Sequence, residues 1–548
     1  MPEHYDFVVI GSGFGGSVSA LRLAEKGYRV IVLEQGRRWT PESLPHSTWD
    51  LRRWIWDPAL GLRGFFSVRF FRHVVVLHGN AVGGGSITYA NTLLVPRPSV
   101  WREGSWAGLA DWERVMPQHY DTARRMLGVT TNRRLDAADE RLREMARACG
   151  VESTFYPTEV GVFFGDDKDP PGTLYPDPYF GGEGPERHSC VGCGGCMIGC
   201  RYGAKNTLDQ NYLFLAQKRG AEVRAETRVV DVRPLGADPT GAQGYEVSSV
   251  SQASGSRAAP ARFTCRGVVF AASSLGTQDL LLRLKARGSL PGLSDVLGHG
   301  VRTNAESLIG VRFPGSTRDL SRGVAIGSGI YIDEHTHVEA VRYPAGSDSM
   351  GLLTTVMTLG RPGWTRIFTW LGTLLRMLLT RPRETLRVLS PRQWAREAVI
   401  LLCMQTLDGE LSMRLKRRWF WPFSRRLATS GARIPTFIPA ANEFALRAAR
   451  VTGGVPMTSV TEILLNVPMT AHCMGGAVMG RDRRQGVIDG RNRVFGYANM
   501  FICDGSALSA NLGVNPSLTI TALTEHAMSH IAVAGEQRWD GMAEEAGT

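Results

Sequence analysis

The sequence lacks any long apolar run, which excludes an ordinary membrane-spanning protein. A helix that crosses a bilayer needs about 18 or more consecutive apolar residues, and no such run occurs in the 548-residue chain. The first strand is expected almost directly after Met1, with neither the charged segment nor the apolar core of a secretory signal ahead of it. We therefore expect a cytoplasmic location.

The sequence also lacks the features of a nucleic-acid-binding protein. The formal net charge is +12, which favours an anionic partner, but neither a basic tail nor a nucleic-acid-binding motif accompanies it. We therefore predict no nucleic-acid partner, and a membrane surface is the favoured anionic partner. The hydrophobic and charged fractions, 43% and 21%, are those of a globular protein, and the length indicates two or more domains.

Cysteine is scarce, and its few copies are unevenly placed. Of the nine cysteines, four have the spacing C-x2-C-x2-C-x3-C: Cys190, Cys193, Cys196 and Cys200. Bacterial ferredoxins use this spacing for an iron–sulfur cluster, although the usual Pro after the last Cys is Arg201 here. In a reducing compartment such clustering indicates metal before disulfides. Two interpretations stay open, namely an iron–sulfur cluster or a Cys-rich structural knot with or without zinc.

The N-terminal segment contains a nucleotide-binding pattern. The apolar run at residues 7–10 predicts a buried parallel strand. Three glycines follow in the G-x-G-x-x-G spacing: Gly11, Gly13 and Gly16. They permit a tight turn, the approach of a pyrophosphate to the main chain, and close packing of the helix predicted over residues 17–26. A second strand at 30–33 ends at Glu34, about 20 residues past the glycines, where a carboxylate accepts hydrogen bonds from a ribose. The ligand is NAD or FAD.

A second Gly-rich segment lies further along the chain. Residues 74–77 predict a strand, and Gly83, Gly84 and Gly85 follow it before another apolar run. Glycine is used where a flat ligand must lie against the main chain, so a close-approach loop is favoured over a merely flexible one. The intervening residues 39–71 are rich in Trp, Arg and Phe, and we expect them to cover part of a cavity.

These two segments resemble the glucose–methanol–choline (GMC) oxidoreductases, and within them the cholesterol oxidase-like branch. In that family FAD is held by the N-terminal fingerprint and by a Gly-rich loop that lies along the flavin. The resemblance implies these FAD-binding positions: Gly11, Gly13, Gly16, Glu34, Gly84, Gly85 and Asn91. One departure is that better-studied cholesterol oxidases place an Asn nearer the triple glycine, where this chain has Tyr89.

The middle of the chain returns to the nucleotide domain. Residues 222–232 predict a strand, and by the same resemblance the backbone of Val229 contacts the adenine. Residues 268–283 resemble the family's strand, turn and helix near the diphosphate. Before them, residues 111–129 and 136–150 predict helices on a connecting segment.

A candidate catalytic carboxylate lies in a predicted antiparallel sheet over residues 307–353. Glu339 is followed by Pro344-Ala345-Gly346, an arrangement that resembles the cholesterol oxidase stretch carrying its catalytic Glu. There the carboxylate moves protons within the steroid during double-bond isomerisation, and a buried carboxylate would have a raised pKa suited to that role. The alternative is a solvated strand Glu.

The C-terminal segment carries the most specific part of the resemblance. His472 lies in TAHCMGGAVMG, and Asn515 directly precedes Pro516. In the family a His and the Asn before this Pro flank the reacting hydroxyl over the flavin, which implies catalytic roles for His472 and Asn515. Residues from Asn515 onward begin a helix whose N–H groups can face an anionic flavin edge. The resemblance also implies cofactor contacts from three more residues: Asp504, Gly505 and Ser517.

Two segments bear on membrane binding. Residues 367–379 form an amphipathic pattern, for which an ordinary core helix is the favoured interpretation. Further on, basic residues at 414–418 run directly into the aromatic-rich residues 419–423. Basic residues interleaved with aromatics suit an anionic lipid interface, so peripheral membrane contact is favoured for this second run.

The predicted fold is an α/β FAD-binding domain, Rossmann-like and doubly wound, built from residues 1–120, 200–310 and 465–548. Residues 121–199 are expected to form a connecting or lid segment that contains the cysteine run. Residues 311–464 are expected to form an α+β substrate domain with an antiparallel sheet.

The predicted function is FAD-dependent oxidation of a secondary alcohol, most specifically the 3β-hydroxyl of cholesterol or a related sterol, with or without isomerisation. The flavin supplies the hydride chemistry, and the protein orients the substrate and the cofactor and supplies the electrostatic environment. One alternative is an FAD/iron–sulfur dehydrogenase of another steroid, alcohol or sugar that uses a quinone or carrier instead of oxygen. Another is a non-catalytic flavin electron-transfer module, against which the intact pair of His472 and Asn515 argues.

Overall fold

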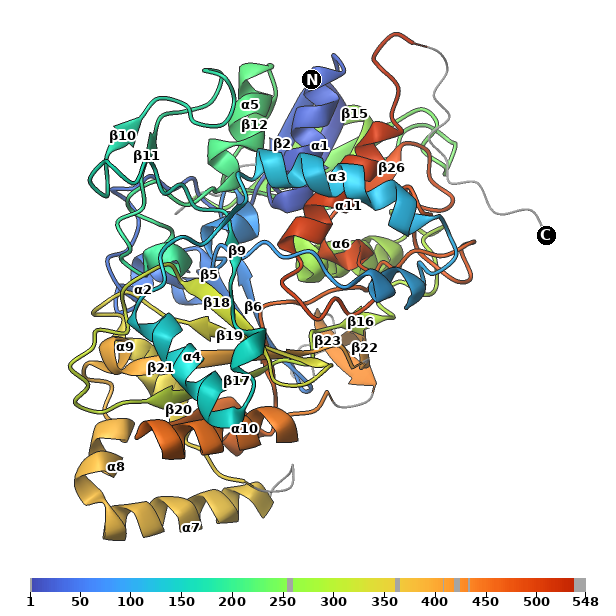
Figure 1. Ribbon diagram of the computed structural model, residues 1–548. Helices are drawn as coiled ribbons and strands as arrows, with labels where there is room; N and C mark the ends of the chain where they lie inside the picture. Colours follow the sequence, from blue (N-terminus) through green and yellow to red (C-terminus); the bar gives the residue numbers. More distant parts are fainter. Residues whose placement is uncertain are drawn as a thin grey trace.

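Two seven-stranded sheets organise the molecule (Figure 1). The structure is a computed structural model, and it describes these parts of the chain: residues 2–253, 260–359, 365–407, 409–417, 424–431 and 434–536. The first sheet is mixed and contains both N-terminal and C-terminal strands, whereas the second is antiparallel and is built from the middle of the chain.

The first sheet has the order β12-β2-β1-β15-β14-β13, with β26 also paired to β15. Its parallel strands are β1 (Glu3–Ile10), β2 (Val30–Leu33), β12 (Glu222–Arg224), β15 (Ala261–Phe270) and β26 (Met500–Ile502). Two antiparallel strands extend one edge: β13 (Thr227–Pro234) and β14 (Tyr245–Ser251). The apolar runs of β1 and β2 are buried because parallel strands have both faces covered. The predicted Rossmann-like sheet is confirmed.

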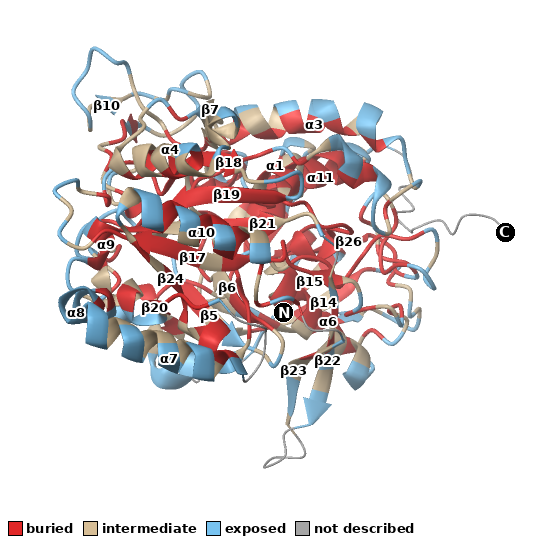
Figure 2. Cartoon of the chain, turned by 60° about the horizontal axis from the view of Figure 1, so that its bottom comes forward, coloured by how far each residue is buried: buried red, intermediate tan, exposed pale blue. Residues whose placement is uncertain are grey.

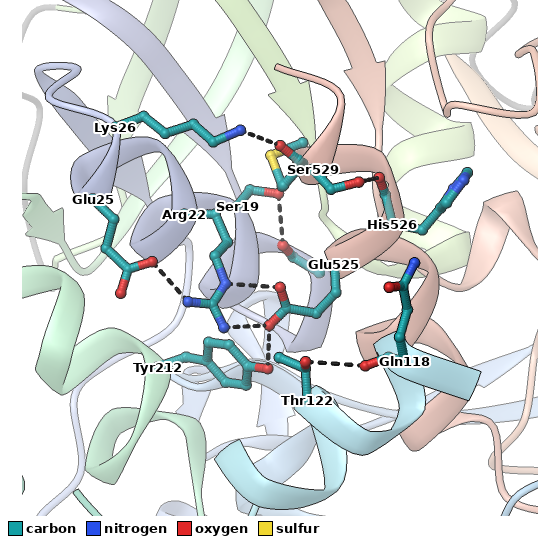
Figure 3. Close-up of polar contacts among 12 residues, drawn as sticks. Ser19, Arg22, Glu25, Lys26, Gln118, Thr122, Tyr212, Glu525, His526 and Ser529 are labelled. Atoms are coloured by element: carbon teal, nitrogen blue, oxygen red, sulfur yellow. Dashed lines mark hydrogen bonds and ion pairs between the residues drawn. The ribbon is translucent and has the colours of Figure 1, made fainter. Parts of the chain in front are cut away.

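Five helices pack on this sheet or on one another beside it. They are α1 (Phe14–Glu25), α3 (Trp112–Met126), α5 (Tyr212–Lys218), α6 (Ser273–Arg287) and α11 (Ser517–Ser529). Figure 3 shows how α1 and α11 are joined: Arg22 donates from Nε and Nη2 to the two carboxylate oxygens of Glu525 at 2.7 and 2.8 Å. The Tyr212 hydroxyl donates to the same carboxylate at 2.6 Å. These contacts fix α11 against the nucleotide-binding helix α1.

The second sheet has the order β20-β24-β17-β21-β19-β18-β8, and its neighbouring strands are antiparallel. Its strands are β8 (Tyr156–Pro157), β17 (Ser307–Arg312), β18 (Ile326–Tyr331), β19 (Thr336–Val341), β20 (Thr354–Val356), β21 (Ala398–Gln405) and β24 (Val455–Ser459). Helices α4 (Ala137–Cys149) and α10 (Pro439–Thr452) cover one face. The predicted antiparallel substrate sheet is confirmed.

Side chains of β21 alternate between the two faces of this sheet. Val399 and Leu401 pack into the core beneath α4 and α10, whereas Ile400 and Leu402 line a cavity on the other face. The segment expected to form a connection or lid also contributes to this layer, because α4 covers the sheet and β8 pairs with β18.

The described chain also contains shorter elements. They are α2 (Leu51–Trp54), α9 (Trp394–Glu397), β3 (Trp56–Asp57), β4 (Leu62–Arg63), β5 (Phe66–Phe70), β6 (Val75–Gly79), β7 (Thr130–Thr131), β9 (Glu159–Val160), β10 (Leu174–Tyr175), β11 (Arg187–His188), β16 (Val301–Arg302) and β25 (Met469–Thr470). Residues of the 39–71 segment, among them Trp54 and Phe66, line the same cavity as Ile400, as the sequence predicted.

The two segments considered for membrane binding have different outcomes. The amphipathic pattern forms α7 (Thr365–Thr380), followed by α8 (Pro382–Leu389), and the prediction of a core helix is wrong because Phe368 is 74% exposed. The basic run enters the hairpin of β22 (Glu410–Arg417) and β23 (Arg425–Gly431), but Arg418 and residues 419–423 lie outside the described residues. No helix in the described part of the chain is long and apolar enough to cross a membrane.

Candidate functional site

A cavity of about 720 Å³ is lined by residues of both sheets. The first sheet contributes Gly11 and Glu34 at the ends of β1 and β2, and the second contributes apolar side chains such as Leu308 and Leu402. Ligands of open α/β sheets bind at the carboxyl ends of parallel strands, and this cavity includes that edge.

The fingerprint glycines have the geometry that their pattern requires. Gly11 has φ +101°, a left-handed conformation that favours glycine. A Cβ on Gly16 would lie 2.0 Å from the Gly11 carbonyl oxygen, so only glycine lets α1 pack this close to the turn. Glu34 is buried beside them and accepts hydrogen bonds from Ser12 N at 3.0 Å and Ser12 Oγ at 2.8 Å. Burial raises the pKa of the Glu34 carboxyl.

The second Gly-rich segment lies directly on the fingerprint turn. Gly84 has φ +53°, and a Cβ there would lie 2.5 Å from the Cα of Gly13. Gly13, Gly84 and Gly85 all line the cavity. Asn91, by contrast, is not part of the lining: its side chain is buried, and neither amide atom has a hydrogen-bond partner among the described residues.

Other positions predicted to contact the cofactor lie around the same cavity. Its lining includes Val229, Asp504, Gly505 and Ser517. Asp504 accepts hydrogen bonds from Ser506 N at 2.8 Å and from Thr277 Oγ1 at 2.5 Å. Ser517 is the first residue of α11, so the N-terminal N–H groups of this helix lie at the cavity and favour a negatively charged group. Backbone without Cβ atoms and a helix N-terminus at one cavity together fit FAD.

The His472 ring is held by contacts at one of its two nitrogens, Nδ1. Nδ1 contacts Glu306 Oε1 at short range and lies 3.2 Å from Asn304 Nδ2. The second Glu306 oxygen accepts a hydrogen bond from Ala471 N at 3.0 Å. Because Nδ1 is occupied, Nε2 is the ring nitrogen left to meet a substrate. Burial alone would lower the pKa of His472, but the adjacent Glu306 carboxylate outweighs it and raises that pKa.

Glu306 and Asn304 are functional candidates that the sequence did not indicate. Ala305 between them has φ +45°, which costs a non-glycine residue about 1–2 kcal/mol. The strain persists because Asn304 Nδ2 donates to Val514 O at 2.8 Å while Glu306 binds the His472 segment. The only signal was an acidic residue at the opening of an apolar strand, and its partner lies 166 positions away.

Asn515 and Glu339 form the other half of this polar group. Asn515 Nδ2 donates to Glu339 Oε2 at 3.3 Å, and Glu339 is fully buried, which excludes the solvated alternative. Burial raises the pKa of Glu339 to about 7, although the bond from Asn515 opposes the shift. Glu339 Oε1, Asn515 Oδ1 and Asn304 Oδ1 are buried without partners among the described residues. An unpaired buried polar atom costs about 1–3 kcal/mol, so a polar group bound here would be stabilised.

Comparisons with known proteins match this architecture. Residues 425–524 match the family model described as GMC oxidoreductase, and residues 6–43 match an FAD binding domain. A cholesterol oxidase of Acinetobacter baumannii is 56% identical over 527 residues, covering 96% of this chain and 94% of the relative. The chain belongs to the GMC oxidoreductases. Within this family it is an FAD-dependent enzyme of the cholesterol oxidase-like branch.

Other relatives of this GMC oxidoreductase are more distant. A cholesterol oxidase of Mycobacterium tuberculosis is 46% identical over 538 residues, covering 96% of this chain and 91% of the relative. The crystal structure of pyridoxine 4-oxidase from Mesorbium loti is similar in fold, with a TM-score of 0.60 at 16% identity, covering 96% of this chain and 98% of that chain.

The cysteine run of the GMC oxidoreductase lines a separate small cavity. All four predicted ligands border it: Cys190, Cys193, Cys196 and Cys200. They are free thiols, and three backbone N–H groups donate to three of the sulfurs at 3.4 Å. However, the described residues contain no three His, Cys, Asp or Glu side chains placed to hold a metal ion. The iron–sulfur cluster therefore stays a prediction.

A buried amine joins this cysteine cavity to the Gly-rich loop. Lys205 Nζ donates to Cys196 O at 2.6 Å and to Ile87 O at 2.9 Å. Ile87 ends the 3₁₀ turn Gly84–Ile87, which begins at the glycines over the fingerprint. Burial lowers the pKa of Lys205 to about 8. The cysteine run is thus packed against the loop that the family uses for the flavin.

Proposed function

We propose that this GMC oxidoreductase oxidises the 3β-hydroxyl of cholesterol or a related sterol to the ketone, with oxygen as electron acceptor. The observation that carries the proposal is the cavity, whose largely apolar lining ends in one buried polar group, His472 and Asn515. A sterol has the matching chemistry, because it is a rigid apolar body with a single hydroxyl. Two relatives at 56% and 46% identity that are named cholesterol oxidase support this substrate class.

The cofactor would be held by groups on the first sheet and on α11. The fingerprint glycines and Gly84 offer bare backbone, Glu34 offers a carboxylate to a ribose, and Ser517 offers a helix N-terminus. When bound, FAD accepts the hydride from the carbinol carbon of the substrate.

His472 would accept the hydroxyl proton at Nε2. This role requires a neutral imidazole, and the Glu306 carboxylate stabilises the imidazolium that forms. Asn515 would orient the substrate oxygen, since its Oδ1 has no other partner among the described residues. Glu306 acts through His472 and is a positioning residue.

Glu339 would carry a second step, the movement of the sterol double bond into conjugation with the new ketone. Its carboxylate takes a proton from the ring carbon between the ketone and the double bond and returns it further along the ring system. With a pKa near 7, the group exchanges protons readily at neutral pH.

The test is product analysis with cholesterol under air. We expect one ketone and one hydrogen peroxide for each cholesterol consumed, and we expect the 3α-epimer to be inert. Peroxide formation from short-chain or sugar alcohols at a higher kcat/KM than from cholesterol would contradict the proposed substrate class.

A second candidate function is a dehydrogenase that uses an acceptor other than oxygen. It is favoured by one observation, the four thiols around one cavity that Lys205 ties to the Gly-rich loop. An iron–sulfur cluster there would give electrons an exit to a quinone or carrier protein. Iron and acid-labile sulfide in anaerobically prepared protein, lost in Cys193→Ser, would support this candidate. Protein from iron-replete cells that contains neither element would leave oxygen as the acceptor.

A further inference from the structure

A buried lysine, Lys205, connects the cysteine run to the Gly-rich loop. The residue is 1% exposed, and its ammonium donates to three main-chain oxygens: Cys196 O at 2.6 Å, Ile87 O at 2.9 Å and Tyr89 O at 3.3 Å. Ile87 ends the turn that lies on the fingerprint, and Tyr89 lines the main cavity. Since an ammonium has three N–H donors, all of them are used between these two segments.

The positive charge of Lys205 lacks a counter-ion, and so does that of its neighbour Arg187. Arg187 is also 1% exposed, and its guanidinium donates to neutral groups, among them Gly203 O and Lys205 O at 3.1 Å each. Among the described residues neither cation has a carboxylate within 4.0 Å. The Asp209 carboxyl acts on both from beyond that distance, and burial raises its pKa. Buried charges are costly unless an opposite charge balances them.

The cysteine cavity is the place where an anion would balance these cations. Lys205 lines it together with the four free thiols of the run, and the charge of Cys200 acts on both Lys205 and Arg187. A free thiol is neutral at neutral pH, whereas a metal-bound thiolate keeps its negative charge. A metal–thiolate centre in this cavity would therefore supply the missing negative charge.

The main chain around the sulfurs has the geometry of a ligand turn. Three N–H groups donate to sulfur at 3.4 Å: Gly192 N to Cys190, Lys205 N to Cys200 and Ala325 N to Cys196. Such bonds are among the means by which proteins tune iron–sulfur clusters. Cys200 itself has φ +70°, a left-handed conformation that is strained in a non-glycine residue. Strain of this kind persists where the surrounding structure requires it, and it is concentrated at functional sites.

The substrate sheet holds the cysteine run from the other side. Gly194 N donates to Gly323 O at 2.8 Å, and Gly323 N donates to Gly192 O at 2.9 Å. A Cβ on Gly194 would lie 2.2 Å from Ser321 O, so this close contact requires glycine. Gly323 and Ala325 lead into β18, and Figure 2 shows strands of that sheet, such as β19 and β21, as buried. The run is thus fixed between the substrate sheet and the Gly-rich loop.

The arrangement fits a cluster of several irons better than one metal ion. Among the described residues, no three His, Cys, Asp or Glu side chains are placed to hold a single ion. A zinc site needs four sulfurs at about 2.3 Å from one centre. In a four-iron cluster each thiolate binds a different iron, so the sulfurs surround a larger body.

We propose that Lys205 couples two cofactor sites. Its ammonium balances the charge of an iron–sulfur cluster held by Cys190, Cys193, Cys196 and Cys200, and its bonds to Ile87 and Tyr89 hold the loop on which FAD lies. Each cofactor then strengthens binding of the other, because coupling between two sites is reciprocal. The proposal rests on the FAD site and on the cluster of the second candidate function, and it holds for any alcohol substrate.

The first test compares three forms of the whole wild-type protein under anaerobic conditions: treated with an iron chelator, reconstituted with ferrous iron and sulfide, or given Zn²⁺ alone. The FAD dissociation constant of each form is measured. We expect iron and acid-labile sulfide in the reconstituted form only, and FAD affinity about tenfold higher there than in the other two. Equal FAD affinity with and without iron would overturn the coupling. Zinc that restores FAD affinity, or protein that takes up neither iron nor sulfide, would overturn the cluster.

The second test concerns Lys205 itself. Lys205→Met keeps the apolar stem without the charge, and we expect its affinity for iron to fall about tenfold, as for groups that support metal ligands. Reconstitution should no longer tighten its FAD binding. Lys205→Arg keeps the charge and should recover part of both effects. Lys218→Met is the matched control, because Lys218 also donates to a main-chain oxygen, Glu183 O at 2.7 Å, but is exposed. Iron-dependent FAD binding in Lys205→Met equal to that of wild type would refute the role of Lys205.

Neither test uses an alcohol, so the outcome is separate from that of the proposed function. If iron tightens FAD binding but cholesterol is not oxidised, the sterol proposal fails and the coupling stands. If the protein oxidises cholesterol with oxygen but takes up neither iron nor sulfide, the coupling fails and the sterol proposal stands.

Discussion

At the scale of single residues, the orientation and the pKa of the His472 ring depend on Glu306. If Glu306 is replaced by Gln, we expect turnover at its optimum to fall by about 10- to 100-fold, as for outer partners that orient a histidine. Turnover rises with pH through the pKa of His472, because the proton acceptor must be neutral. Since Glu306 raises that pKa, Glu306→Gln should shift the rising limb of the pH–kcat profile to lower pH.

Two further variants control this measurement. Glu306→Asp keeps the negative charge and should return the rising limb of the pH–kcat profile part of the way to its wild-type position. Glu462→Gln removes another buried carboxyl, which accepts a hydrogen bond from Ser307 Oγ at 2.9 Å, and it should leave the pH limb in place. An unshifted limb in Glu306→Gln would show that Glu306 is merely structural.

The pair of His472 and Asn515 should be indispensable to turnover but not to cofactor binding. We expect His472→Ala and Asn515→Leu each to lower kcat by about 10²-fold or more, the scale of a positioned acid–base group. Flavin absorbance of the purified variants should equal that of wild type. Near-normal turnover in both variants would mean that the reacting hydroxyl lies elsewhere.

Glu339 should separate oxidation from isomerisation. Glu339→Gln should release the ketone with its double bond unmoved, since an amide does not accept the proton. In wild type, isomerisation requires the ionised carboxylate, so its rate should increase as pH rises through about 7. Chromatography of the two ketones against pH checks both statements, and a conjugated ketone from the variant would assign the proton transfer to another group.

Residue-level prediction from the sequence reaches only as far as local contacts. Gly11, Gly16 and Glu34 lie within one strand–helix–strand unit, so their spacing alone fixes their relation. Glu306 could not be found this way, because its contact with His472 arises only when two distant segments meet. Asn91 is the opposite case. Its sequence position matches a family position that contacts FAD, but its side chain lies outside the cavity lining.

At the scale of elements, the Gly-rich loop is seated on the fingerprint turn by backbone contact. Gly84→Ala should release FAD, because its Cβ would lie 2.5 Å from Gly13 Cα, a contact between two backbones. Gly220→Ala is the matched control: Gly220 also has positive φ, +87°, but nothing lies within 4 Å of its Cβ position. Flavin retained after gel filtration is the readout, and equal retention in the two variants would refute this role of the loop.

Helix α7 illustrates what an apolar pattern leaves undecided. The sequence predicted the helix correctly, but its residues carry apolar side chains on two faces, and periodicity alone does not tell which one is buried. Arg366 is 1% exposed and donates to Thr436 O at 3.3 Å, while Phe368 is exposed. The buried face is set by packing against β20 and α8, which periodicity within the helix does not report.

At the scale of the whole molecule, the site exists because two sheets meet around one cavity. The first sheet supplies the nucleotide turn, the second supplies an apolar wall, and the segment after β16 supplies Glu306. Glu339 on β19 lies behind this lining, where it accepts a hydrogen bond from the lining residue Asn515. The two-domain plan could be predicted because the strands of the two sheets have different local patterns. Those of the first sheet are continuous apolar runs, and those of the second have the alternation of an antiparallel sheet. The contribution of β8 and α4 to the second sheet could not, since strand pairing across long loops leaves no local pattern.

The central claim is that a sterol hydroxyl reacts in this cavity, and anaerobic titration of the purified protein with cholesterol tests it most directly. We predict that one equivalent of cholesterol bleaches one equivalent of bound flavin and yields one equivalent of ketone. The 3α-epimer and His472→Ala should leave the flavin oxidised. Flavin that stays oxidised with excess cholesterol, yet is bleached by a non-sterol alcohol, would contradict the account.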